Sequence, residues 1–244
     1  MKPVAIIMRR ELGAYFATAI AYVVLVIFLF LANLFAFGFG GLYERQQADL
    51  APFFNFLPWL YLILIPAVSM RLWAEERNSG SIELLLTQPL TMWQAVLGKF
   101  LAAWVFVGIA LALTFPVWIT INYLGNPDNG AILAAYLGSL FFAGGFLAVG
   151  SFTSSITKNQ LVAFLIALLM CFLLLVAGYP VVTDFLPRWA PQWLVDGIAS
   201  LSFDTHFENI IKGVLDLRDV LYFALVTVFF LLASTVVLDS RKSK

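Results

Sequence analysis

The chain has 244 residues, of which 62% are hydrophobic and 11% charged, whereas soluble domains average about 45–50% apolar and about 25% charged residues. So few charges do not cover a water-exposed surface, which excludes a soluble enzyme or a disordered chain. The 14 basic residues are balanced by 14 acidic ones, which leaves no positive field for nucleic acid, and the single cysteine excludes an internal disulfide. The sequence therefore predicts an all-α integral membrane protein, surrounded by lipid.

Residues 4–16 carry apolar side chains at helical spacing on one face and basic residues on another. This pattern predicts an amphipathic N-terminal helix that lies in the membrane interface and leads into the first span. Its charged residues are Arg9, Arg10 and Glu11, which break any early apolar region, so a cleaved signal peptide is not expected. A plain positively charged anchor is the alternative interpretation.

Long uncharged segments locate six membrane spans, and the shortest of these segments, residues 220–238, has 19 residues. A helix of that length reaches about 28 Å, close to the hydrocarbon thickness of about 30 Å. We expect six transmembrane helices in a single domain that covers residues 1–244. The predicted spans are residues 17–40, 54–73, 98–122, 132–153, 160–180 and 220–238.

Lysine and arginine residues predict the orientation, because they accumulate on the cytoplasmic side of a membrane. With the N-terminus inside, ten of the 14 basic residues fall in inner segments. The other four, Arg45, Arg188, Lys212 and Arg218, fall in outer segments. Both termini are therefore predicted in the cytoplasm, as an even number of spans requires.

The longest non-spanning segment, residues 180–219, is predicted on the outer side. Three prolines interrupt its start, and Trp189 and Trp193 suit a membrane interface. We expect two short helices in it, near 191–201 and 206–215. Packing at the interface and a role in gating both stay open for these helices.

The predicted spans contain no well-buried Asp, Glu, Lys, Arg or His. Intramembrane ionisable groups mark proton relays and ion pathways, so their absence argues against a transporter driven by an ion gradient and against an intramembrane metalloprotease. The only histidine, His206, has no partner histidine, and no serine or cysteine has a general base nearby in the sequence. We therefore predict no catalytic residue, no metal site and no cofactor bound by this chain. Energy for any transport has to come from elsewhere.

Small residues gather in the fourth predicted span. Ser139 and Ala143, and likewise Gly144 and Ala148, are four residues apart, which lets two helix backbones approach closely. The pattern indicates a tight helix contact, either within the chain or with a partner.

A dense charge cluster follows the second predicted span and ends at a glycine that permits a sharp turn. A serine after the glycine can cap a short helix, a glutamate lies in its first turn where the helix dipole favours an acid, and a proline ends it. Such a short, charged helix suits docking of a cytoplasmic partner. The residues predicted for this docking are Glu75, Glu76, Arg77, Gly80, Ser81, Glu83, Leu84 and Pro89.

The run EERNSGSIELLLTQPL at residues 75–90, followed by Gly98 and Lys99, resembles the hallmark of type-2 ABC transporter permeases. One departure is Ser81, where that family usually has threonine. Because both residues cap helices, the departure leaves the predicted short helix intact.

Two further stretches make the resemblance closest to the gliding-motility-associated permease subfamily. The first is RELGAYF at residues 10–16 with IAY at 20–22, and the second is HFEN at 206–209 leading to GVLDLRDVLYF at 213–223. The resemblance thus covers the beginning, middle and end of the chain.

The resemblance implies the transmembrane permease subunit of an ATP-driven exporter in a bacterial inner membrane. It makes Arg9, Arg10 and Glu11 part of a connecting helix and residues 75–89 a coupling helix. It also implies a second cytoplasmic contact between the fourth and fifth spans, at Thr157, Lys158 and Asn159. The expected partners are a second permease subunit, identical or different, and a cytoplasmic ATPase that binds ATP and Mg²⁺. The chain has no Gly-rich phosphate loop of its own, so the ATPase is a separate polypeptide.

Two other classes of function stay open at this point. The chain could be a membrane anchor or assembly subunit of a gliding or secretion machine, without transport of its own. It could also be a passive channel, although the lack of charged or strongly polar residues in the spans speaks against a water-filled pore. ATP hydrolysis that is coupled to substrate movement would indicate an exporter and not an anchor. Ion conductance in the absence of an ATPase would indicate a channel.

Overall fold

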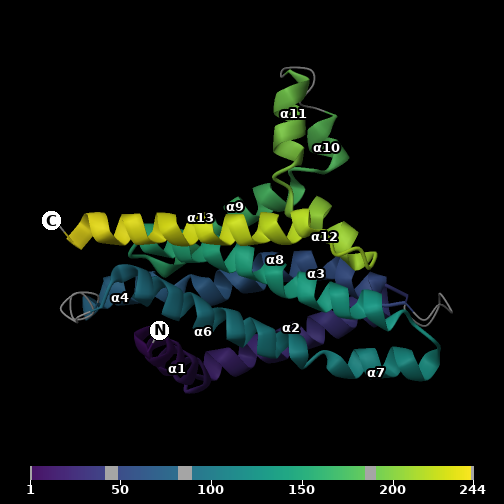
Figure 1. Cartoon of the computed structure of the whole chain (residues 1–244). Coiled ribbons are helices and arrows are strands. Elements are labelled where there is room, and N and C mark those ends of the chain that lie inside the picture. The colour runs from purple at the N-terminus through teal and green to yellow at the C-terminus, as the bar shows by residue number, and fades with distance from the viewer. Residues whose placement is uncertain (1, 42–48, 82–89, 185–190, 243–244) are drawn as a thin grey trace.

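The computed structural model describes residues 2–41, 49–81, 90–184 and 191–242, and all regular structure in these residues is helical. The elements are α1 (Lys2–Phe16), α2 (Ala19–Asn33), the π-helix η1 (Leu34–Phe39), α3 (Ala51–Ser69), α4 (Arg71–Ser79), α6 (Met92–Ala112), α7 (Phe115–Leu124), α8 (Asn129–Ile156), α9 (Gln160–Val176), α10 (Pro180–Thr183), α11 (Gln192–Ala199), α12 (Phe203–Ile211) and α13 (Leu217–Lys242). The long helices lie side by side in a bundle, and both ends of the chain lie toward the same end of it as α4 (Figure 1).

Five helical segments among the described residues are long and apolar enough to cross a membrane, and they coincide with five of the six predicted spans. The helix in the remaining predicted span, α9, is apolar but has 17 residues, which gives a length of about 26 Å. A crossing by α9 therefore stays a prediction. The five candidate spans are Ala19–Phe39, Ala51–Ser79, Met92–Leu124, Asn129–Ile156 and Leu217–Ser240.

The third candidate span is interrupted, because α6 ends at Ala112 and α7 follows after a short break. Pro116 causes the break: it lacks an amide hydrogen, and its ring collides with the carbonyl of the residue four positions earlier, which is Ala112. At the break, the hydroxyl of Thr114 donates a hydrogen bond of 2.6 Å to the carbonyl of Leu111. The two halves thus form one bent, apolar segment.

Helix α8 lies at the centre of the bundle, and small residues let its neighbours approach closely. A Cβ atom at Gly145 would lie 2.5 Å from the ring of Phe203 in α12, and one at Gly150 would collide with the side chain of Ser69 in α3. Among the small residues predicted to make a close helix contact, the contact is confirmed for Gly144, because a Cβ atom there would lie 3.2 Å from Nε1 of Trp104 in α6. These contacts lie within the chain.

Two short helices, α11 and α12, occupy the predicted outer segment. Helix α12 begins earlier than the predicted 206–215, because Phe203 anchors its start. Phe203, Phe207 and Ile210 share one face and are almost fully buried. The described structure therefore gives α12 a packing role against the bundle.

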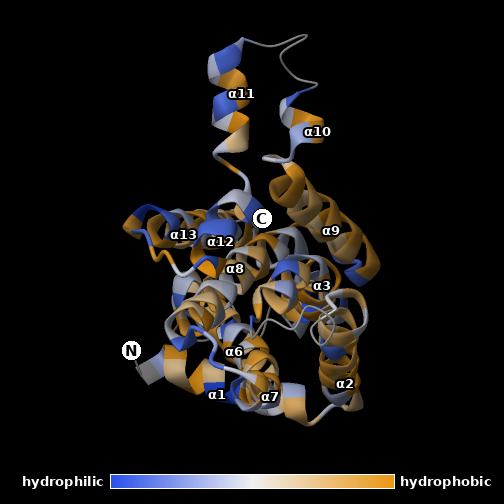
Figure 2. Cartoon of the chain, turned by 90° about the vertical axis from the view of Figure 1, so that its right-hand side faces the viewer, coloured by the Kyte–Doolittle hydropathy of each residue, from blue (hydrophilic) through white to orange (hydrophobic). Residues whose placement is uncertain are grey.

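Helices α10 and α11 project sideways from the bundle, at a steep angle to the long helices (Figures 1 and 2). We call residues 180–184 and 191–199 the α10–α11 arm. Most side chains of α11 are exposed, including Trp193 at 72%, and Val195 is its buried residue. The arm is thus attached to the rest of the chain mainly at its base.

The outside of the bundle is apolar, as the colouring of α2 and α9 in Figure 2 shows. Val26 of α2, Leu169 of α9 and Leu225 of α13 are all more than half exposed. A continuous apolar exterior is unfavourable in water and matches the hydrocarbon of a bilayer. The fold is that of a multi-pass membrane protein.

We expect Gly145→Ala to destabilise the protein by about 1–3 kcal/mol, because the new methyl group has to displace the buried ring of Phe203. Gly197→Ala is the matched control, since no atom lies within 4 Å of a Cβ at that position. Thermal unfolding in detergent micelles measures both changes. Equal melting temperatures for the two variants would contradict the packing of α12 against α8.

Candidate functional site

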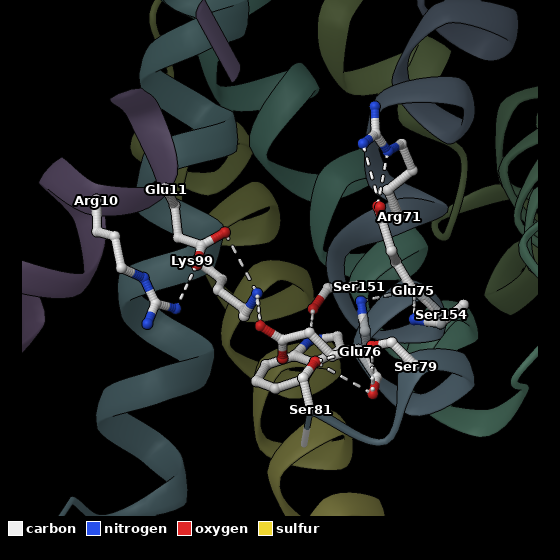
Figure 3. Close-up of polar contacts among 12 residues, drawn as sticks. Arg10, Glu11, Arg71, Glu75, Glu76, Ser79, Ser81, Lys99, Ser151 and Ser154 are labelled. Atoms are coloured by element: carbon white, nitrogen blue, oxygen red, sulfur yellow. Dashed lines mark hydrogen bonds and ion pairs between the residues drawn. The ribbon is translucent and has the colours of Figure 1, made fainter. Parts of the chain in front are cut away.

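Segments that the sequence predicts as separate contacts meet at one end of the bundle (Figures 1 and 3). Helix α1, helix α4 and the end of α8 come together there beside α6. We call this region the α4 junction. Its residues are Arg10, Glu11, Arg71, Trp73, Glu75, Glu76, Arg77, Lys99, Ser151, Ser154 and Ser155.

Lys99 of α6 is the centre of the α4 junction. Its Nζ lies 2.8 Å from Oε1 of Glu76 in α4 and 3.3 Å from Oε2 of Glu11 in α1 (Figure 3). The lysine side chain is 4% exposed, and a buried ammonium group costs several kcal/mol unless it is paired. Two carboxylates from two other helices provide that pairing, so Lys99 joins α1, α4 and α6.

Trp73 and Gly98 complete the surroundings of this lysine. The Nζ of Lys99 lies 5.2 Å from the centre of the Trp73 ring, within the range of a cation–π interaction. The indole Nε1 of Trp73 donates to Oγ of Ser151 at 3.2 Å. A Cβ atom at Gly98 would lie 2.8 Å from the side chain of Ile7, so the glycine allows α1 to lie close to α6. Gly98 thus allows α1 to approach α6, and Lys99 holds α1 there through its ion pair with Glu11.

Ser154 of α8 fixes the start of α4. Its Oγ accepts hydrogen bonds from the amides of Trp73 and Ala74, both at 3.0 Å, and donates to the carbonyl of Met70 at 2.8 Å. The first amides of a helix have no partner within the helix, so a side chain of another helix satisfies them here. The link runs to backbone atoms and therefore sets the position of α4 itself.

Arg77 connects α4 to the end of α8. Its Nη1 donates to the carbonyl of Ser155 at 2.5 Å, and the residue is buried. The turn at residues 157–159 follows directly, where the side chain of Asn159 caps α9 and Lys158 is exposed. The predicted coupling segment and the predicted second contact are thus neighbours in the structure.

Helix α4 ends at Gly80, whose φ of 74° lies in the left-handed region that favours glycine. The predicted sharp turn at Gly80 is confirmed. Among the described residues, no atom lies within 4 Å of a Cβ at this position, and the left-handed φ itself calls for glycine. Beyond Ser81, the predicted short helix with Glu83, Leu84 and Pro89 lies outside the described residues.

A cleft of about 360 Å³ opens between α1, α4 and α6. Arg71 and Glu75 pair at 2.9 Å along one face of α4, which lines the cleft, and Arg10 pairs with Glu11 at 2.6 Å on α1. Three acids and two bases therefore face the cleft, which gives it an acidic balance. These five side chains are Glu11, Arg71, Glu75, Glu76 and Lys99.

Lys99 is absent from the site residues that the sequence predicts. The expectation that the spans hold no well-buried ionisable group is wrong at this residue, which lies at the start of the predicted span 98–122 and is buried. The sequence did contain a signal for an ion pair at Lys99. This lysine directly follows an apolar segment, and the acids on the same side of the membrane had no assigned partner. Ser151 and Ser154 carried no such signal, because their hydrogen bonds depend on how α8 packs against α4.

The α4 junction consists of ion pairs and hydrogen bonds between helices, which suits the transfer of displacement from one helix to another. Within the described part of the chain, no three His, Cys, Asp or Glu side chains lie close enough together to hold a metal ion. His206 instead pairs with Asp219 at 2.6 Å, at the other end of the bundle.

Apolar helices of spanning length, one of them interrupted at a proline, are joined at one end by a buried ionic junction, and together they define a multi-pass membrane protein. Residues 60–242 match a family model that describes the ABC-2 family transporter proteins. The chain belongs to the ABC-2 transporter family.

Similar proteins include a heme exporter and a permease. Heme exporter protein B of Paracoccus denitrificans (strain Pd 1222) is 31% identical over 126 residues, which are 51% of this chain and 54% of that protein. The probable multidrug ABC transporter permease YbhS of Escherichia coli (strain K12) is 27% identical over 165 residues, which are 67% of this chain and 42% of that protein. The chain thus spans about half the length of the curated relatives that it matches.

We expect Lys99→Met to lower the free energy of unfolding by about 3 kcal/mol, because it leaves two partly buried carboxylates without their cation. Oε2 of Glu76 is buried and has no hydrogen-bond partner among the described residues, so Glu76 depends strongly on this lysine. Denaturant unfolding in detergent micelles measures the change.

Lys212→Met is the matched control, because Lys212 pairs with Glu208 on the surface, where an ion pair contributes about 0–1 kcal/mol. Combining Lys99→Met with Glu11→Gln and Glu76→Gln should recover part of the loss. Equal stabilities of the two methionine variants would refute the central role of Lys99.

We also expect a pH dependence from Glu11. Burial favours its neutral form, but the charge of Lys99 and the hydrogen bond from Arg10 outweigh burial and hold the pKa of Glu11 below its ordinary value of 4.5. Its stabilisation is therefore present above pH 4.5 and is lost as the pH falls through the lowered value. The melting-temperature difference between the natural protein and Glu11→Gln should shrink accordingly, and a constant difference into acid would contradict this account.

Proposed function

We propose that the chain is the permease subunit of an ATP-driven exporter, and that a separate ATPase subunit provides the energy. Membership of the ABC-2 family supports transport. The observation that carries the coupling is the contact of Lys99 with Glu11 and Glu76, because it makes α1, α4 and α6 one mechanical unit. The likeness of the terminal stretches to the gliding-motility-associated subfamily belongs to this proposal.

The ATPase docks on the α4 junction. The acidic cleft, the exposed Arg9 and Arg10 of α1, and Lys158 in the turn between α8 and α9 give it charged surfaces at the same end of the bundle. ATP and Mg²⁺ bind in the ATPase, and this chain is the non-catalytic membrane subunit.

Movement passes from the docking surface to the opposite end of the bundle through α8. Closure of the ATPase pushes on α1 and α4, and Ser154 ties the backbone of α4 to α8. Farther along α8, Gly145 packs closely on Phe203 of α12, and Gly138, nearer the other end of α8, packs closely on Ile210 of α12. A displacement of α4 therefore reaches α12, and the tilted helices open a path for the substrate.

In the membrane, the chain crosses six times, with α9 as the fifth span and both termini in the cytoplasm of a bacterium. The position of both chain ends at one end of the bundle supports an even number of crossings (Figure 1). The excess of basic residues in the segments at that end supports its cytoplasmic location.

Export requires a second permease subunit, and the exposed apolar faces of α2, α9 and α13 leave room for one beside the bundle. The second subunit is another copy of this chain or a related one. The names of the two relatives, a heme exporter and a probable multidrug permease, support export of an organic molecule with apolar parts.

The proposal is tested by reconstituting the chain with its ATPase in liposomes and comparing Gly80→Val with Gly80→Asn. Valine is strained at a φ of 74°, whereas asparagine tolerates the left-handed region. We expect Gly80→Val to lose about tenfold or more of coupled transport, an effect of about 1–2 kcal/mol on the turn. Gly80→Asn should retain most of it.

Gly197→Val in α11 serves as a control at a site far from the ATPase. Transport that survives Gly80→Val unchanged would refute a rigid turn in the coupling path. Binding of the ATPase without any ATP-dependent transport in the natural protein would identify a membrane anchor instead.

A further inference from the structure

Three polar residues, His206, Asn209 and Asp219, have no part in the proposed docking of the ATPase. They come together where α12 meets the start of α13, at the end of the bundle opposite to α4. Nδ1 of His206 lies 2.6 Å from Oδ1 of Asp219, and Nδ2 of Asn209 lies 3.5 Å from Oδ2 of the same carboxylate. The histidine is thus part of a built contact between two helices.

Both ring nitrogens of His206 face oxygen atoms. Nε2 lies 3.1 Å from the carbonyl oxygen of Ser200, in addition to the contact of Nδ1 with Asp219. A backbone carbonyl is an acceptor only, and so is an ionised carboxylate. A neutral imidazole has one N–H and one lone pair, so it satisfies one of these oxygens and turns its lone pair on the other. Imidazolium, with two N–H groups, satisfies both.

We propose that His206 is held as an imidazolium that clasps the base of the α10–α11 arm to α13, and that loss of one proton releases the arm. The short distance to Asp219 is typical of a charge-assisted hydrogen bond. Asp219 is itself buried in the first turn of α13, where the helix dipole favours a negative charge.

The clasp acts on two adjacent carbonyls directly after the end of the arm. His206 binds the carbonyl of Ser200, and the hydroxyl of Tyr222 donates to the carbonyl of Leu201, the first and second residues after the arm. The ring of His206 also stacks on that of Tyr222, with the centroids 4.0 Å apart. Deprotonation therefore weakens one of these two links at the base of the arm.

The other charged groups nearby are engaged elsewhere. On α12, Glu208 pairs with Lys212 at the surface, and the carboxyl of Asp204 faces Tyr179, with its pKa raised mainly by burial. Before α13, the carboxylate of Asp216 accepts from the amide of Arg218. Asp219 and Tyr222 are therefore the titratable groups that face the imidazole directly.

Nitrogen NMR of the natural protein tests the proton directly, because the sequence contains one histidine and ¹⁵N-histidine labels that ring alone. The protein is purified without a histidine tag and placed in lipid nanodiscs. We expect a state in which both ring nitrogens have the shifts of protonated nitrogen, and a shift of one of them on raising the pH. One unprotonated nitrogen at every pH at which the protein stays folded, including a proton placed on Asp219 instead, would overturn the proposal.

A spin label on the arm tests the release. Gly197→Cys places the label at an exposed position with no atom within 4 Å of the Cβ, and the native Cys171 is fully buried. We expect the label to become more mobile as the pH rises through the change seen by NMR. In a His206→Gln background it should be mobile at every pH, while Glu208→Gln should leave the pH response unchanged. If the mobility of the label did not change with pH in the protein that retains His206, the clasp would be refuted. This result is independent of whether the ATPase docks on the α4 junction.

Discussion

A buried ammonium group between two carboxylates from different helices holds the α4 junction together. The side chain of Lys99 is buried, so its charge depends on Glu11 and Glu76, and these acids depend on it in return. The dependence is mutual, and α1, α4 and α6 therefore keep their relative positions. Hydrogen bonds from α8 add to this, because Ser154 binds backbone atoms of α4 and Arg77 binds a backbone atom of α8.

The central helix α8 relates this junction to the rest of the fold. Serines at one end of α8 bind α4, and glycines along its length admit Ser69 and Phe203 of neighbouring helices. Interfaces of small residues allow close packing without the hydrophobic effect, which is absent between helices in lipid. A closely packed helix that touches both ends of the bundle is a suitable path for displacement, and it fits a member of a transporter family.

Features that depend on one segment alone could be predicted from the sequence. Charge gaps located the candidate spans, helical spacing predicted α1, and the left-handed turn followed from Gly80. Features that depend on two segments could not. The apolar face of α1 was expected against the membrane surface, yet its Ile7 packs on Gly98 of α6. Lys99 was part of the run that resembles the permease hallmark, but its burial could not be predicted, because that burial arises only when α1 and α4 close over it.

The pairing of α1 with α6 has a consequence for biosynthesis. The ribosome delivers α1 and α4 to the membrane before α6, so Glu11 and Glu76 reach the bilayer surface without their common cation. Both acids stay hydrated until Lys99 arrives, so the three helices close only after α6 has been inserted. The contacts of Ser154 and Ser155 follow when α8 is made, so a chain that ends before α8 lacks the complete α4 junction.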